Sequence, residues 1–169
     1  MNSSDILADG FGRVREVVHN LGGAVSADAL LYRPDPDANT IAWLLWHTAR
    51  VIDSQVAEVA GREQVWTADG WAARFAFPFD PSATGYGQNA HEVGQVQAGI
   101  DDLVGYYDAV HEMVIEYVGG VDEQELDRIV DERWTPPVSA GVRLVSCIED
   151  GLQHVGQASY VLGLAERQR

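Results

Sequence analysis

The stretch VSAGVRLVSCIEDGLQHVGQASYVLGL, residues 138–164, decides the fold that we predict for this chain. It follows Pro136-Pro137, contains no further proline, and repeats apolar residues at steps of three and four, the period of one helix face. We expect a helix whose main buried stripe is Val145, Ile148, Leu152, Val155, Ser159 and Leu162. A second face, made of small residues, runs beside it at Cys147, Gly151, Ala158 and Ala165. The helix should therefore be packed on several sides.

Three more segments share the helical period. We expect helices from about Asp5 to Leu21, capped by Ser3 or Ser4, and from Asn39-Thr40 to about Val59. Residues 89–118 keep the period throughout and predict one long helix. Between these helices lie two long connections, residues 62–88 and 121–137, with Trp71-Ala-Ala-Arg74 as a short helix and Arg128-Ile-Val130 as a short extended piece. Helices dominate, and the long connections favour a bundle with crossovers.

Composition limits the classes of function. With 169 residues the chain fits a single domain, residues 1–169. A formal net charge of −15 disfavours binding to nucleic acid and to anionic membrane surfaces. No apolar run approaches the roughly 20 residues of a membrane span. The N-terminus does not resemble a secretory signal, and a single cysteine, Cys147, suits a reducing compartment, so we expect a cytoplasmic location.

Two separated stretches suggest a metal site. Asp150 and His154 are four residues apart, so on a helix they project from the same face. His47, in Trp43-Leu-Leu-Trp-His47, is a candidate third ligand from a second helix. Two imidazoles and one carboxylate suit zinc, nickel or ferrous iron and leave coordination positions open. The alternative is structural, because an Asp–His pair at this spacing can be a surface contact and His47 can be a core histidine.

Aromatic residues crowd the connection at 62–88, where a long loop can form a lid or a pocket wall. We interpret Trp66, Trp71 and Phe75 as the wall of a pocket, although they could simply cover one end of the bundle. Cys147 lies one turn before Gly151, and we expect it to be a packing residue. His19, His91 and His111 are expected to be structural or solvated.

Several motifs spread over nearly the whole chain are, taken together, fairly specific. They are Asn39-Thr-Ile-Ala-Trp-Leu-Leu-Trp-His47, Trp71-Ala-Ala-Arg-Phe75 with Pro78, Thr84-Gly-Tyr-Gly-Gln88, Pro136-Pro-Val138, Gly141-Val-Arg-Leu144, and His154-Val-Gly-Gln157 with Tyr160 and Gly163. On these residues the chain resembles the DinB-like superfamily of four-helix-bundle metalloenzymes. Within it, the chain is most similar to the actinobacterial branch of mycothiol transferases.

The resemblance implies an all-α, DinB/YfiT-like bundle with up-up-down-down topology, long crossover connections and a metal at one end. The ligand positions of the superfamily fall on His47, Asp150 and His154. Many members carry three histidines, whereas this chain has a carboxylate at the middle position. The resemblance also implies zinc or nickel, and transfer of a low-molecular-weight thiol such as mycothiol or bacillithiol to electrophiles.

We therefore expect a metal-dependent thiol S-transferase acting on small electrophiles. Trp71, Arg74 and Gln157 are the candidate pocket residues. Two alternatives stay open, a metal-dependent hydrolase that activates water and a non-catalytic, stress-response protein that binds a metal or ligand. A homodimer is compatible with such a bundle, although no residue pattern in the chain specifies one.

Overall fold

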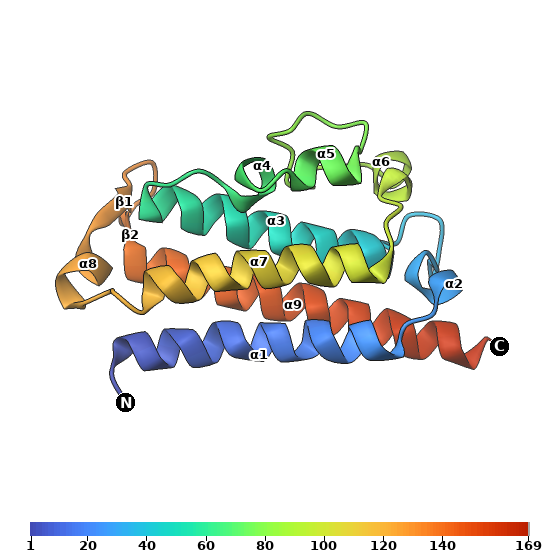
Figure 1. Cartoon of the computed structure of the whole chain (residues 1–169), viewed down its shortest axis with the longest axis horizontal. Coiled ribbons are helices and arrows are strands. Elements are labelled where there is room, and N and C mark those ends of the chain that lie inside the picture. Colours follow the sequence, from blue (N-terminus) through green and yellow to red (C-terminus); the bar gives the residue numbers. More distant parts are fainter. Residues whose placement is uncertain (169) are drawn as a thin grey trace.

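Four long helices of the computed structural model, which describes residues 1–168, lie side by side as a bundle (Figure 1). They are α1 (Ser3–Ala24), α3 (Ile41–Ala60), α7 (Ile100–Val118) and α9 (Ala140–Arg167). Both α1 and α3 pack against α7 and α9, so α1 and α3 occupy opposite corners. The predicted helical bundle is confirmed. The apolar core fills the space between these four helices.

The helix order corrects the expected up-up-down-down topology. Ser4, at the start of α1, donates to the carbonyl of Val118, at the end of α7, so these two helices are antiparallel. Near the start of α9, Arg143 donates to Gln55, near the end of α3, so α3 and α9 are also antiparallel. Along α3 and α7, Tyr106 bonds to Asp53 and Arg62 bonds to Glu116 further on, so these two helices run in the same direction. The order is therefore up-down-down-up. The reason lies in the connections: residues 25–40 turn the chain straight back, whereas residues 61–99 return along the whole bundle before α7 begins (Figure 1).

Capping groups set the helix starts. The side chain of Asn2 accepts from the backbone N–H of Asp5 while Asp5 bonds back to Asn2, so the predicted cap at Ser3 or Ser4 is wrong by one or two residues. Thr40 and Ser139 cap α3 and α9 through their hydroxyls. Gly61 ends α3 in the left-handed region, at φ 65°, as its position in the sequence predicts.

The single helix expected over residues 89–118 is two helices. The first, α6, spans Ala90–Gln95, and α7 begins only at Ile100 after its cap Gly99. Val96 leaves the helical conformation with ψ 84° and is fully buried. Val96 packs into the core although its backbone is not helical, so the apolar period of the sequence runs through the break between α6 and α7. Periodicity alone therefore could not reveal this break.

The four residues of the predicted small-residue face of α9 are all buried, whereas Val155 is the one fully buried member of the predicted main stripe. Val145 is 59% exposed and Leu152 is 39% exposed, whereas Gly151 and Ala158 are buried. A Cβ at Gly151 would lie 3.3 Å from Val14 and 3.4 Å from Ile52. Small residues on α9 let α1 and α3 approach closely at this level.

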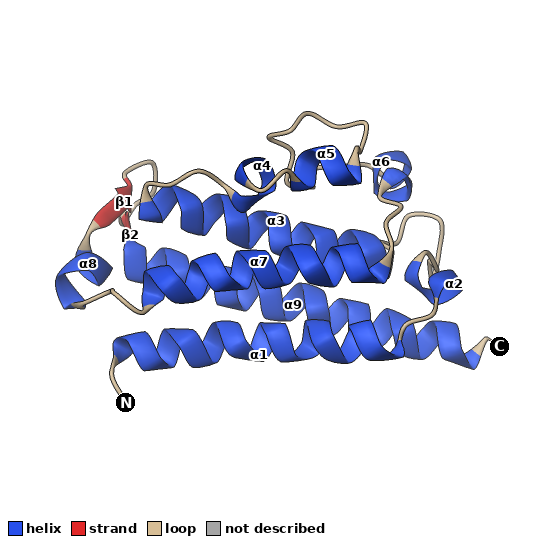
Figure 2. Cartoon of the chain, viewed as in Figure 1, coloured by secondary structure: helices blue, strands red, loops and turns tan. Residues whose placement is uncertain are grey.

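Short elements cover the ends and one side of the bundle (Figure 2). They are α2 (Ala27–Leu30), α4 (Val65–Ala68), α5 (Trp71–Phe75), α8 (Glu123–Asp127) and an antiparallel pair of strands, β1 (Ile129–Asp131) and β2 (Val138–Ser139). The short helix and the extended piece expected in the two connections are thus confirmed. Over residues 1–168, none of the helices has the length and apolar character needed to span a membrane.

Candidate metal centre

Three predicted residues converge between α3 and α9. His47 comes from the middle of α3, and Asp150 and His154 come from successive turns of α9; one potential ligand atom of each lies within 4.8 Å of the other two. The ring centroids of His47 and His154 are 4.7 Å apart, and His154 Nε2 is 3.4 Å from Asp150 Oδ1. Antiparallel packing of α3 on α9 creates this cluster, because it places the middle of each helix opposite the other.

The orientation of His47 is fixed by the loop that follows α5. His47 Nδ1 lies 2.5 Å from the carbonyl oxygen of Thr84, so Nδ1 carries the proton and Nε2 keeps a free lone pair. The imidazole also stacks on Trp43, with centroids 4.4 Å apart, and Trp43 donates to Gln88 over 2.7 Å. Gly85 permits this approach: its φ is 98°, and a Cβ there would lie 2.7 Å from His47 Nδ1.

Two atoms of the cluster are buried without a hydrogen-bond partner, Asp150 Oδ2 and His154 Nδ1. An unpaired buried polar atom costs about 1–3 kcal/mol, so natural proteins rarely leave one unsatisfied. A divalent cation would use such lone pairs, and two imidazoles with one carboxylate are a donor set that zinc, nickel and ferrous iron accept. The residues present therefore fit a divalent metal and would leave coordination positions for another ligand.

The charge states of the cluster favour metal binding. Burial lowers the pKa of His47, and the neighbouring His154 lowers it further, while the bond to Thr84 acts in the opposite direction. Asp150 is partly buried, but its hydrogen bond with His154 lowers the pKa of the Asp150 carboxyl group. At neutral pH His47 is then neutral and Asp150 is ionised. Asp150, and to a smaller extent Gln157, raises the pKa of His154, so a metal competes with a proton for this imidazole.

A cavity of about 490 Å³ adjoins the cluster on the side of the β1–β2 hairpin. It shares Asp150 with the cluster and lies between α3, α9 and the hairpin, lined by Val51, Gln55, Asp131, Arg133, Trp134, Val138, Val142, Arg143, Ser146, Cys147 and Asp150. Sequence reasoning missed its two arginines. Arg143 could have been found from the sequence. It lies seven residues, or about two helical turns, before Asp150, so both side chains share one face of the helix. Arg133 could not have been found in this way, because it belongs to a loop.

The predicted pocket residues lie in different places. Trp71 packs on Tyr106 of α7 with centroids 5.6 Å apart, and Arg74 forms an ion pair with Asp102. Among the residues described, neither makes a hydrogen bond or a ring contact with the histidine–aspartate cluster. Gln157 is exposed and lies near His154, whose pKa it raises.

Cys147 is buried, and burial raises the pKa of its thiol to about 12. A thiol that stays protonated at neutral pH is a poor nucleophile. The position therefore agrees with the predicted packing role, even though the residue contributes to the wall of the cavity.

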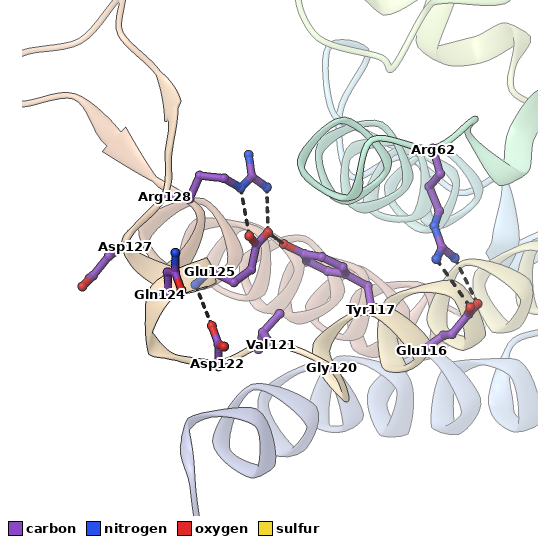
Figure 3. Close-up of a pocket in the computed structure, with 10 residues that line it drawn as sticks. All are labelled: Arg62, Glu116, Tyr117, Gly120, Val121, Asp122, Gln124, Glu125, Asp127 and Arg128. Carbon is purple, nitrogen blue, oxygen red and sulfur yellow. Dashed lines mark hydrogen bonds and ion pairs between the residues drawn. The ribbon is translucent and has the colours of Figure 1, made fainter.

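The largest hollow lies elsewhere, at the end of the bundle formed by α7 and α8 (Figure 3). Its volume is about 1020 Å³, but both of its arginines pair with glutamates. Arg62 bonds to Glu116, and Arg128 bonds to Glu125, which also accepts from Tyr117 over 2.6 Å (Figure 3). By volume alone this hollow would be the candidate functional site. The unpaired ligand atoms instead indicate the cluster between α3 and α9.

A helical bundle with two histidines and a carboxylate converging between two of its helices has the features of a metal-binding bundle. The family comparison agrees: the model of the DinB superfamily matches residues 11–158, and the chain belongs to that family. The chain is also similar to a conserved protein from Enterococcus faecalis of known crystal structure, with a TM-score of 0.89, 28% sequence identity and 96% of each chain covered. No curated protein matches the chain.

Proposed function

We propose that the protein is a metal-dependent thiol S-transferase that acts on small electrophiles. The observation that carries this proposal is the convergence of His47, Asp150 and His154, with two of their buried ligand atoms unpaired, beside an open cavity. Membership of the DinB superfamily, whose members are often metal-dependent enzymes, supports it. Zinc or nickel is the expected metal because both accept imidazole and carboxylate ligands.

The bound cation would lower the pKa of a small thiol and hold it as a thiolate, the nucleophilic form. His47, oriented by the Thr84 carbonyl, and the Asp150–His154 pair would provide the protein ligands. The sulfur belongs to the small thiol, since Cys147 is held protonated by its burial. The new S–C bond forms as the electrophile's leaving group departs with its electron pair. Gln157, which raises the pKa of His154, is assigned to orienting that imidazole.

Metal analysis of untagged protein tests the site first. We expect one equivalent of zinc or nickel in the wild type and loss of metal in His47→Ala, Asp150→Ala and His154→Ala, with Arg13→Gln on the outer surface of α1 as a matched control that keeps the metal. Metal content that is unchanged in all three variants would remove the basis of the proposal.

The thiol is tested separately, by isothermal titration of the zinc-loaded protein with mycothiol. We expect binding in the wild type and none in His154→Ala. Equal binding by both proteins, or by neither, would contradict the proposed thiol transfer. Turnover of a thioester without any added thiol would instead favour a hydrolase that activates water.

A further inference from the structure

The cavity beside Asp150 is lined by two arginines, Arg133 and Arg143, in a chain whose formal net charge is −15, and by two aspartates, Asp131 and Asp150. Arg133 donates to both carboxylate oxygens of Asp131, over 2.9 and 2.8 Å. Arg143 donates to the same carboxylate over 3.1 Å. Two guanidinium groups therefore share one carboxylate among the residues that line this cavity. Glu58 reaches Arg143 only from the rim, at 3.9 Å with its side chain 65% exposed.

Both guanidinium groups keep donors that these bonds do not use. A guanidinium carries five N–H groups, and neither Arg133 Nη1 nor Arg143 Nε takes part in the bonds to Asp131 or Gln55. Arg143 is held in place by Gln55 and Asp131, and only 14% of its side chain is exposed. A preorganised and largely desolvated guanidinium is a strong partner for a carboxylate.

Helix α9 sets the distance between the cavity arginine Arg143 and the candidate metal ligand Asp150. Arg143 and Asp150 are seven residues apart on α9, which corresponds to about 10 Å along its axis. Between them the cavity wall is less polar, formed by Cys147 together with Val51 on α3. Trp134, 64% exposed on the hairpin loop, adds an indole to the wall. The volume of about 490 Å³ suits a small molecule.

We propose that this cavity binds the carboxylate end of a small co-substrate, with Arg133 and Arg143 as the anion-binding residues. The rest of the molecule lies along Val51 and Cys147, so that its other end reaches the cluster at Asp150. The proposed function supplies one part of this inference, that the end of the molecule near Asp150 is a thiol. The anion subsite itself depends only on the two arginines. The subsite favours co-substrates that carry a carboxylate about six to eight bonds from their other end, over neutral molecules of equal length.

Two thiols of equal length test the subsite by isothermal titration of the zinc-loaded protein. One is 6-mercaptohexanoate, and the other, 6-mercaptohexanol, differs only in lacking the carboxylate. We expect the carboxylate to bind about tenfold more tightly, which corresponds to about 1.4 kcal/mol, since hydrogen bonds between charged groups are stronger than those of a neutral hydroxyl. Arg133→Gln and Arg143→Lys should each reduce this ratio severalfold while zinc affinity and binding of the alcohol stay unchanged. Arg13→Gln, which also removes an arginine from an ion pair, should keep the full ratio.

Equal affinities of the two thiols in the wild type would overturn the subsite, as would a full preference that persists in both cavity variants. A third probe, hexanoate, contains no sulfur and separates failure of the subsite from failure of thiol transfer. If hexanoate and 6-mercaptohexanoate bind equally tightly, and Arg143→Lys weakens both, the anion subsite stands and the proposed thiol chemistry is wrong. If neither carboxylate binds, the subsite is wrong as well.

Discussion

Helix α3 carries two buried polar clusters on neighbouring turns, and they differ in how far their polar atoms are satisfied. In the first, Arg50 and Asp53 are completely buried, and Asp53 accepts from Tyr106 over 2.7 Å and from the backbone N–H groups of Val65 and Trp66 over 2.8 Å. In the second, around His47, Asp150 Oδ2 and His154 Nδ1 have no partner.

The contrast separates a structural cluster from a ligand site. Arg50 donates to the carbonyl of Ala83 over 3.1 Å and to Gln64 over 3.0 Å, so the first cluster ties the long connection to α3. That connection also supplies the Thr84 carbonyl to His47. The satisfied cluster therefore supports the unsatisfied one: it fixes the loop that orients a candidate ligand, while the ligand atoms themselves are left for a cation.

The largest expected effect comes from breaking the satisfied cluster. Asp53→Ala leaves the buried charge of Arg50 without a counter-charge and removes the acceptor of Tyr106 and of two backbone N–H groups. Removal of one partner of a buried ion pair costs about 3–5 kcal/mol. We expect that loss in the free energy of unfolding, measured in urea. Asp9→Ala, which removes a carboxylate from an exposed pair with Arg13, should leave stability almost unchanged. Equal stability of the two variants would show that the buried cluster is not structural.

The unsatisfied cluster should behave in the opposite way, since its stability depends on the metal. Zinc at about 100 times its dissociation constant should stabilise the wild type by roughly 2.7 kcal/mol. Asp150→Ala and His154→Ala should lose this gain and, without metal, unfold at much the same urea concentration as the wild type. Chemical denaturation with zinc and with EDTA measures both. A large loss of stability in these variants without metal would mean that the cluster is structural like that of Arg50.

A smaller effect is expected where the two clusters meet. In Gly85→Ala the new Cβ would meet His47 Nδ1, and we expect zinc affinity to fall about tenfold because a group that orients a ligand is displaced. Gly87→Ala is the matched control: Gly87 also has a positive φ, 76°, but a Cβ there meets nothing within 4 Å. A competition titration with a zinc-binding dye compares them. Equal losses in both variants would assign the effect to backbone strain.

The smallest effect concerns protons at the same cluster. The pKa of His154 is raised by Asp150, so in the metal-free protein the stability from its charged form is present at low pH and is lost as pH rises through that pKa. Zinc must displace this proton, so its affinity should fall as pH is lowered. NMR titration should find the His154 pKa above the ordinary histidine value in the wild type and lower in Asp150→Asn. A His154 pKa in Asp150→Asn that equals the wild-type value would contradict the pairing of His154 with Asp150.

Local patterns in the sequence predicted most of the helices and the Asp150–His154 pair, because spacing along one helix fixes which side chains share a face. They did not predict the break between α6 and α7, since Val96 continues the apolar period while its backbone turns. They also misplaced the main buried stripe of α9, of which Val155 alone is fully buried. Large apolar residues normally mark the buried face, but here Gly151 and Ala158 are buried so that neighbouring helices can approach.

The sequence by itself determined most of the helical segments, the acidic character and the Asp150–His154 pair, which follow from short-range spacing and composition, while the resemblance to the family indicated His47. Only the tertiary structure decided the up-down-down-up order, the bond between Thr84 and His47, and the cavity with Arg133 and Arg143. These features join residues far apart in the chain. Their positions depend on how the helices pack and where the long connections run, and neither is encoded in the periodicity of a single segment.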